Sequence, residues 1–153
     1  MTSDKPIVSS VRVMPRRPLP AALKLWLAAE ILAECVCVKW RLSRVDLRTL
    51  TEGARERERR RRTGCVLSPG EEEVIAVRLA QATTRTLRIL PKEPKCLVQS
   101  LVVSALLSAR GIRSTLVIGV RSDPEFSAHA WVEREGRALL PRRDFQNSRL
   151  LEI

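Results

Sequence analysis

Cys96 lies at a position in the sequence that favours a nucleophilic thiol. It follows Pro94 and Lys95, and apolar side chains recur every three or four positions over 95–110, which predicts a helix that begins beside this thiol. The amides at a helix N-terminus and a neighbouring ammonium group favour a thiolate, and the same amides can stabilise an oxyanion. The alternative is a cysteine that merely packs at the start of a helix.

His129 is the one histidine of the chain and a candidate general base. Imidazole is the side chain whose charge ordinarily changes near neutral pH. In a strand over 128–133, His129 and Trp131 share one face, and a histidine at the end of a strand can face a cleft. A lone histidine also fits a structural role. We expect Cys96 and His129 to form a catalytic pair, in which the imidazole takes the thiol proton.

A third group that orients the imidazole is predicted at Asp144. The carboxylates downstream of the histidine are Glu133, Glu135, Asp144 and Glu152. A hairpin that turns at 135–136 pairs residue 129 with about residue 143, which places Asp144 beside His129 on the returning chain. The alternative is an exposed loop acid next to two arginines.

The elements around these residues predict an α+β fold. Helices are predicted over 19–40, 45–62, 69–89 and 95–110, with Ser68 as a cap of the third, and strands over 114–120, 128–133 and 137–140. This order predicts a helix packed on a small antiparallel sheet, preceded by N-terminal helices. We expect residues 1–65 to form a helical region packed on a core of residues 66–153, with a short strand at 7–14.

Charge and composition narrow the classes of partner. The 153 residues carry a formal net charge of +11, from 28 Lys and Arg against 17 Asp and Glu. A basic balance attracts anionic partners. Tyr is absent and one histidine cannot supply a zinc finger, so no nucleic-acid partner is expected. The sequence contains neither a metal-ligand cluster nor a phosphate-binding loop, so no metal and no cofactor are expected.

The apolar segment 19–40 contains Lys24, Glu30 and Glu34, which argues against an integral membrane segment. We expect a helix that is buried or faces a partner. The basic run at 55–62 is either a solvated helix face or a docking site for an acidic peptide.

The four cysteines and the N-terminal sequence indicate the cellular compartment of the protein. Residues 1–18 lack an apolar stretch that could be a secretory signal, and a reduced, cytoplasmic protein is expected. Cys35 and Cys37 are spaced poorly for a disulfide, and we expect both to be small core residues.

Four segments resemble the transglutaminase-like superfamily, and more closely the leader peptidases of bacterial lasso-peptide biosynthesis. They are KCLVQSL at 95–101, LLSARGI at 106–112, LVIGVR at 116–121 and AHAWVE at 128–133. Their order and spacing carry the resemblance, which covers roughly residues 70–150. It implies a papain/transglutaminase-like core and a Cys-His-Asp protease.

The resemblance also implies a substrate and partners. Such a protease cleaves the leader from a ribosomally made precursor peptide, a small leader-recognition protein presents that leader, and an ATP-dependent lasso cyclase closes the ring. The acid of the family commonly lies about a dozen residues after the histidine, where this chain has Pro141. Either Asp144 takes its place, or Cys96 and His129 act as a dyad.

Two other functions stay open at this point. The same residues can pass an acyl group to an amine instead of water, as in an acyl-transferring transglutaminase-like enzyme. A basic surface and an apolar N-terminal helix would also suit a non-catalytic peptide-binding scaffold.

Overall fold

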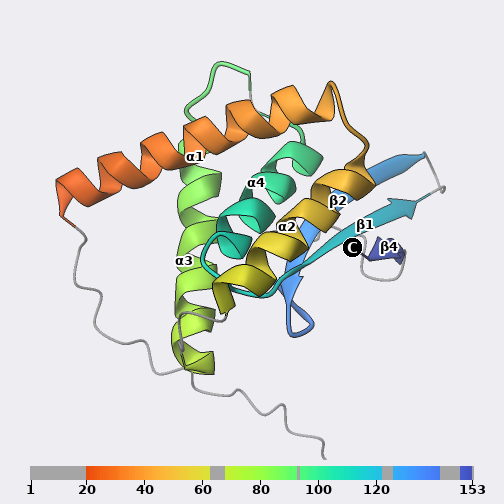
Figure 1. The fold of residues 1–153 in the computed structure, drawn as a ribbon. Coiled ribbons are helices and arrows are strands. Elements are labelled where there is room, and N and C mark those ends of the chain that lie inside the picture. Colours follow the sequence, from red (N-terminus) through yellow and green to blue (C-terminus); the bar gives the residue numbers. More distant parts are fainter. Residues whose placement is uncertain (1–19, 63–67, 93, 122–125, 142–148, 153) are drawn as a thin grey trace, which may run out of the picture.

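Four helices and four antiparallel strands make up the part of the chain that the structure describes (Figure 1). The structure is a computed structural model that describes residues 20–62, 68–92, 94–121, 126–141 and 149–152. The helices are α1 (Ala21–Leu42), α2 (Leu47–Arg62), α3 (Pro69–Leu87) and α4 (Cys96–Ser108). The strands are β1 (Thr115–Arg121), β2 (Ser127–Arg134), β3 (Arg137–Ala138) and β4 (Arg149–Glu152). The predicted α+β class is confirmed.

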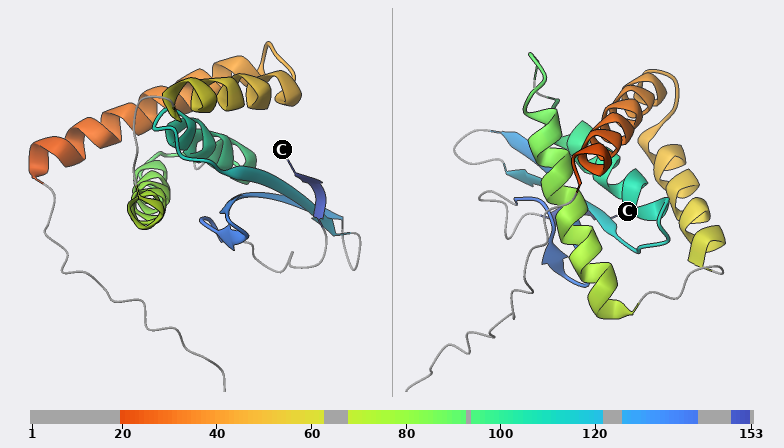
Figure 2. Two further views of the ribbon diagram at one scale, coloured as in Figure 1. Left: turned by 60° about the horizontal axis from the view of Figure 1, so that its bottom comes forward. Right: turned by 90° about the vertical axis from the view of Figure 1, so that its left-hand side faces the viewer.

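Helix α4 is the central element of the fold. Its sequence, CLVQSLVVSALLS, carries no charge and is apolar on all sides. A helix of this kind is stable only when it is covered all round. It contacts α1, α2 and α3 as well as β1 and β2, and Figure 2 shows it between the α1–α2 pair and the sheet. Gly111, with a φ of 71°, ends the helix in the left-handed conformation that glycine adopts at low cost.

The sheet has the strand order β3-β2-β1-β4. β1 and β2 pair from Thr115 opposite Glu133 to Arg121 opposite Ser127. The predicted turn at 135–136 is confirmed, because Glu135 and Gly136 have φ values of 49° and 76°, as a type I′ turn requires.

Two details of the sheet differ from the sequence prediction. β3 covers 137–138 instead of 137–140, and its register, with Glu133 opposite Ala138, is one residue tighter than a pairing of 129 with about 143. β4 pairs with the other edge of β1 and was not predicted. The strand expected at 7–14 lies outside the described residues.

Helix α3 begins as its sequence predicts. Ser68 Oγ accepts a hydrogen bond from the Glu71 N–H at 3.4 Å, and the Ser68 N–H donates to Glu71 Oε2 at 3.0 Å. These reciprocal bonds form a capping box. The hydrogen bonds from the backbone and the hydroxyl of Ser68 lower the pKa of the Glu71 carboxyl. The side chains of Ser68 and Glu71 therefore accept hydrogen bonds from backbone N–H groups at the N-terminus of α3.

Helix α1 has two apolar faces. One face packs into the core through Ile31, Cys35 and Val38. The other carries large side chains that are more than half exposed, namely Leu25, Trp26, Val36 and Trp40. Cys35 is buried as predicted, but the prediction is wrong for Cys37, which lies on the exposed face. Among the described residues, no helix combines the length and apolarity needed to cross a membrane.

Arg134 joins the end of β2 to the beginning of α3. The side chain of Arg134 is 5% exposed. Its guanidinium donates to Glu72 at 2.6 Å and to Glu73 at 3.0 Å, and it lies 3.1 Å from the carboxylate of Glu135. Burial alone would lower the pKa of Arg134, but the bonds to Glu72 and Glu73 and the charge of Glu135 raise it overall. This ion-pair cluster fixes the sheet against the N-terminal turn of α3.

The ion-pair cluster predicts a stability effect. Arg134→Ala should lower the free energy of unfolding by about 2 kcal/mol, because hydrogen bonds to charged groups contribute about 1.5–3 kcal/mol and the carboxylates lose their partner. Arg137→Ala, on exposed β3, is the matched control and should change it by less than about 0.5 kcal/mol. Chemical denaturation measures both, and equal midpoints would contradict the anchoring role of Arg134.

Candidate active site

Cys96 is the first residue of α4 and is partly buried. The preceding residue, Lys95, makes no capping hydrogen bond with its side chain, and the first turn contains no acid. The first amides of a helix have no acceptor within it. At α3 a capping box meets this need, whereas at α4 the amides and the helix dipole are left to stabilise a negative charge. The thiol therefore lies beside backbone amides of the kind that stabilise an oxyanion.

Two side chains hold the first turn of α4 in place. Gln99 Nε2 donates to Thr84 Oγ1 at 2.8 Å, which ties the turn to α3. Ser100 is completely buried, and its Oγ donates to the carbonyl oxygen of Ala130 at 3.0 Å, which ties the turn to β2. The helix head that carries Cys96 is thus fixed relative to two neighbouring elements.

His129 lies in β2 and is 9% exposed. Its Nε2 is 2.8 Å from the carbonyl oxygen of Pro141. The imidazole stacks on Trp131, with 6.1 Å between ring centroids and 20° between ring planes. The Trp131 indole is itself fixed, because its Nε1 donates to Glu133 Oε1 at 2.7 Å. The carbonyl of Pro141 therefore contacts one edge of the imidazole of His129, and Trp131 contacts one ring face.

The Ser100–Ala130 hydrogen bond brings the two candidate residues into one region. Cys96 lies one helical turn before Ser100, and His129 directly precedes Ala130. The Ser100–Ala130 hydrogen bond between α4 and β2 therefore lies one helical turn from Cys96 and one residue from His129. Both residues therefore lie near the junction between α4 and β2.

The third predicted residue, Asp144, lies outside the described residues. Of the other downstream carboxylates, Glu133 accepts a hydrogen bond from Trp131, Glu135 pairs with Arg134, and Glu152 belongs to β4.

Two hydrogen-bonded neighbours of the candidate residues were missed from the sequence. A serine in an apolar helix gives no sign of which strand it will bond, so Ser100 was overlooked. The carbonyl of Pro141 was overlooked because backbone acceptors have no side-chain signature.

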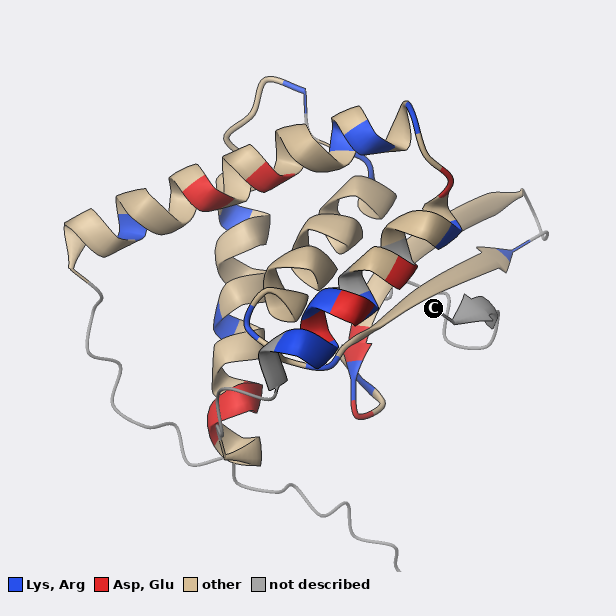
Figure 3. Cartoon of the chain, in the orientation of Figure 1, with Lys and Arg blue, Asp and Glu red and all other residues tan. Residues whose placement is uncertain are grey.

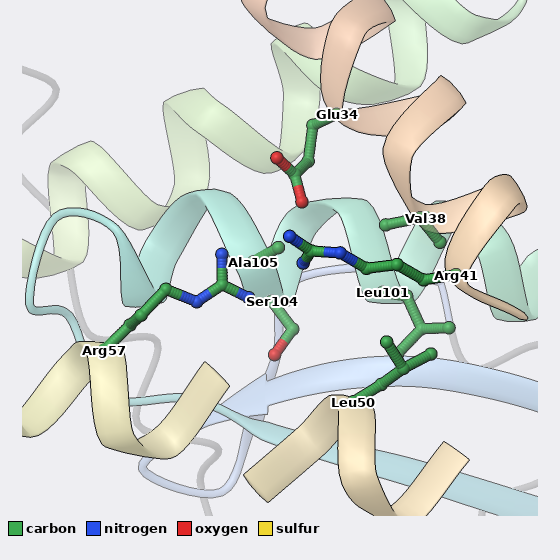
Figure 4. Close-up of a pocket in the computed structure, with 8 residues that line it drawn as sticks. All are labelled: Glu34, Val38, Arg41, Leu50, Arg57, Leu101, Ser104 and Ala105. Carbon is green, nitrogen blue, oxygen red and sulfur yellow. The ribbon is translucent and has the colours of Figure 1, made fainter. Parts of the chain in front are cut away.

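A small cavity lies elsewhere, between α1, α2 and α4 (Figure 4). Its volume of about 20 Å³ has room for roughly one water molecule. The lining residues are Glu34, Val38, Arg41, Leu50, Arg57, Leu101, Ser104 and Ala105. Neither Cys96 nor His129 is among them, so this cavity is separate from the candidate site. Within the described residues, no group of His, Cys, Asp and Glu could hold a metal ion.

Comparison with known proteins gives a family match. The model of the transglutaminase-like superfamily matches residues 27–148, which is more than half of the chain. The match begins within α1 and includes both Cys96 and His129. No curated protein and no solved structure matches the chain.

The junction between α4 and β2 predicts a local effect of Ser100→Ala. Loss of this bond should lower the free energy of unfolding by about 1 kcal/mol and shift the NMR signals of the single histidine ring. Ser108→Ala is the matched control, because Ser108 is equally buried in α4 but bonds within its own helix, to Ser104. Histidine signals that move equally in both variants would show that Ser100 does not position β2.

Proposed function

Because the chain belongs to the transglutaminase-like superfamily, we propose that it is a cysteine peptidase that removes the leader from a lasso-peptide precursor. Members of this superfamily are commonly cysteine peptidases or acyltransferases. One observation carries the proposal: Cys96 stands at the uncapped head of α4, and this head is hydrogen-bonded to β2 beside His129. The choice of a lasso leader as substrate rests on the four sequence segments that resemble such peptidases.

The proposed reaction uses the thiol and the imidazole in two stages. His129 takes the proton of Cys96, and the thiolate attacks the carbonyl carbon of the bond between leader and core peptide. The amides at the head of α4 stabilise the oxyanion. His129 then gives the proton to the leaving amine, the C–N bond breaks, and the leader stays on Cys96 as a thioester. Water, deprotonated by His129, attacks the thioester and releases the leader acid and the thiol.

A third group that orients His129 completes such a site in many cysteine and serine enzymes. Asp144 stays the sequence-based candidate for it. Transfer of the leader acyl group to an amine, instead of water, would need the same thiol and imidazole, and the mass of the products distinguishes the two outcomes.

The proposal predicts the effect of removing the thiol. Cys96→Ala should abolish leader removal from a co-expressed precursor, because no other group forms the thioester, while its thermal unfolding stays near that of the parent chain. Cys37→Ala is the matched control: this thiol is exposed on α1, and its loss should leave the rate unchanged. Mass spectrometry of the precursor measures both.

Complete leader removal by Cys96→Ala would refute the proposed chemistry. A product in which an amine, not water, has joined the leader acid would assign acyl transfer. Failure of the parent chain itself to cleave, with the precursor still bound, would favour the peptide-binding scaffold.

We also propose that the leader-recognition protein docks on the exposed face of α1. Leu25, Trp26, Val36 and Trp40 lie along about 22 Å of this helix at 1.5 Å per residue. Each is more than half exposed, and a contiguous apolar patch of this size typically marks an interaction site.

The charges around the exposed face favour an acidic partner. Helix α1 contains two acidic residues. Glu30 forms an ion pair with Arg110 at 2.7 Å, and Glu34 lines the small cavity between α1, α2 and α4. Lys24 and Lys39 are exposed on α1, and the neighbouring α2 is rich in arginine (Figure 3). A partner with an apolar surface bordered by carboxylates would complement this face.

The docking proposal predicts a binding defect without a folding defect. The double variant Trp26→Ser, Val36→Ser should weaken binding of the co-expressed leader-recognition protein at least tenfold, because two exposed apolar contacts are lost. The unfolding midpoint should change little, since neither residue is in the core. Calorimetric titration measures the affinity, which should also fall with added salt.

Ile89→Ser is the matched control for surface hydrophobicity, because Ile89 is 83% exposed just beyond α3. Its affinity for the leader-recognition protein should equal that of the parent chain. Equal binding by the α1 double variant, or a loss of equal size in Ile89→Ser, would contradict docking on α1.

A further inference from the structure

We propose that the cavity between α1, α2 and α4 is a binding site for a carboxylate side chain of the leader peptide, separate from the candidate active site. The choice of the leader rests on the proposed peptidase function. The arrangement that carries the site, two arginines that converge in one cavity, does not depend on that function (Figure 4).

Two arginine side chains converge in this cavity. Arg41 extends from α1 and Arg57 from α2, and Figure 4 shows their guanidinium groups directed toward each other. Both residues are partly buried. Within the described residues neither forms an ion pair, and Arg57 donates through Nε to the carbonyl of Gly53 in its own helix at 3.2 Å. Like charges that converge in a partly buried place repel each other, so an anion that binds between them is stabilised by both.

Glu34 determines which anion suits the cavity. Its Oε1 is buried and receives no hydrogen bond within the described part of the chain. The wall of the cavity thus carries the two positive charges of Arg41 and Arg57 and one negative charge, so one positive charge is left over. A ligand with a single negative charge balances it, whereas a dianion would place surplus negative charge beside a buried carboxylate.

The size of the cavity favours a carboxylate over a larger oxyanion. Its volume of about 20 Å³ has room for roughly one water-sized oxygen. One end of a carboxylate fits this space, whereas a tetrahedral phosphate does not. A planar guanidinium also matches a carboxylate through parallel N–H···O bonds. The side chain of an aspartate or glutamate therefore agrees with the charge, the size and the donors of the cavity.

The position of the cavity along α4 relates it to the cleavage site. Ser104, in the cavity wall, lies eight residues after Cys96, which is about 12 Å along the helix axis at 1.5 Å per residue. An extended peptide advances about 3.3 Å per residue, so about four residues cover this distance. The leader precedes the scissile bond, and its acidic residue should therefore lie at least about four positions before that bond. Arg57 belongs to the basic run at 55–62, for which docking of an acidic peptide was one of two interpretations.

The KM for precursor cleavage tests the site. Arg41→Gln and Arg57→Gln should each raise KM by about tenfold or more with kcat unchanged, because a charge-assisted bond is lost away from the reacting atoms. Glu34→Gln should lower KM, because it removes a like charge from the cavity. Arg59→Gln is the matched control, since Arg59 is exposed on α2 and does not line the cavity. An unchanged KM in both cavity variants, or an equal rise in Arg59→Gln, would overturn the proposal.

The acidic residues of the leader supply the complementary change. Replacement of each by its amide should raise KM at one position, at least about four residues before the cleavage site, and this effect should not add to that of Arg57→Gln. Full additivity, or the absence of such a position, would overturn the leader as the ligand.

A small probe separates the site from the peptidase. N-acetylglutamate methylamide carries one carboxylate, and N-acetylglutamine methylamide replaces it by an uncharged group of the same shape. In NMR titrations of the full parent chain, the first should shift the amide signals of Ser104 and Ala105 to saturation and the second should not. Equal responses to both probes, no response to either, or equal saturation by inorganic phosphate would contradict a carboxylate site. An absence of precursor cleavage would refute the peptidase, while the probes would still decide what the cavity binds.

Discussion

The hydrogen bond from Ser100 to the carbonyl of Ala130 joins the helix that carries Cys96 to the strand that carries His129. It is completely buried, where a lost hydrogen bond costs more than at the surface. The thiol and the imidazole lie more than thirty positions apart in the sequence, and this hydrogen bond joins their elements where these pack on each other. Two other contacts near the candidate residues are the hydrogen bond from Gln99 to Thr84 and the one between His129 and the carbonyl of Pro141.

The candidate site lies at the N-terminus of α4, a helix that carries no charged side chain. Three helices and two strands pack against α4. The first turn is where the helix presents unsatisfied amides, and the absence of an acidic cap keeps them available for an anion. The start of α3, by contrast, carries a capping box.

The sequence predicts those features of the fold that local patterns determine. The apolar repeat of α4, the cap at Ser68 and the turn at Glu135–Gly136 each depend on a few neighbouring residues, and the structure contains all three. Features that depend on distant partners were not predictable. β4 is stabilised by pairing with β1, and the exposure of Cys37 depends on which of the two apolar faces of α1 meets the core. The hydrogen bond from His129 to Pro141 involves a backbone carbonyl oxygen. Every residue has this atom, so the residue types do not predict the bond.

The relative reactivity of Cys96 and Cys37 tests the central claim most directly. Cys37 is exposed, while Cys96 is partly buried, so access alone favours alkylation of Cys37. An activated pair reverses this order, because the thiolate is the reacting species. Alkylation by iodoacetamide, followed residue by residue with peptide mass spectrometry, should be faster at Cys96 than at Cys37, and His129→Ala should remove the difference. Alkylation of Cys96 that is no faster than that of Cys37 in the parent chain would contradict the account.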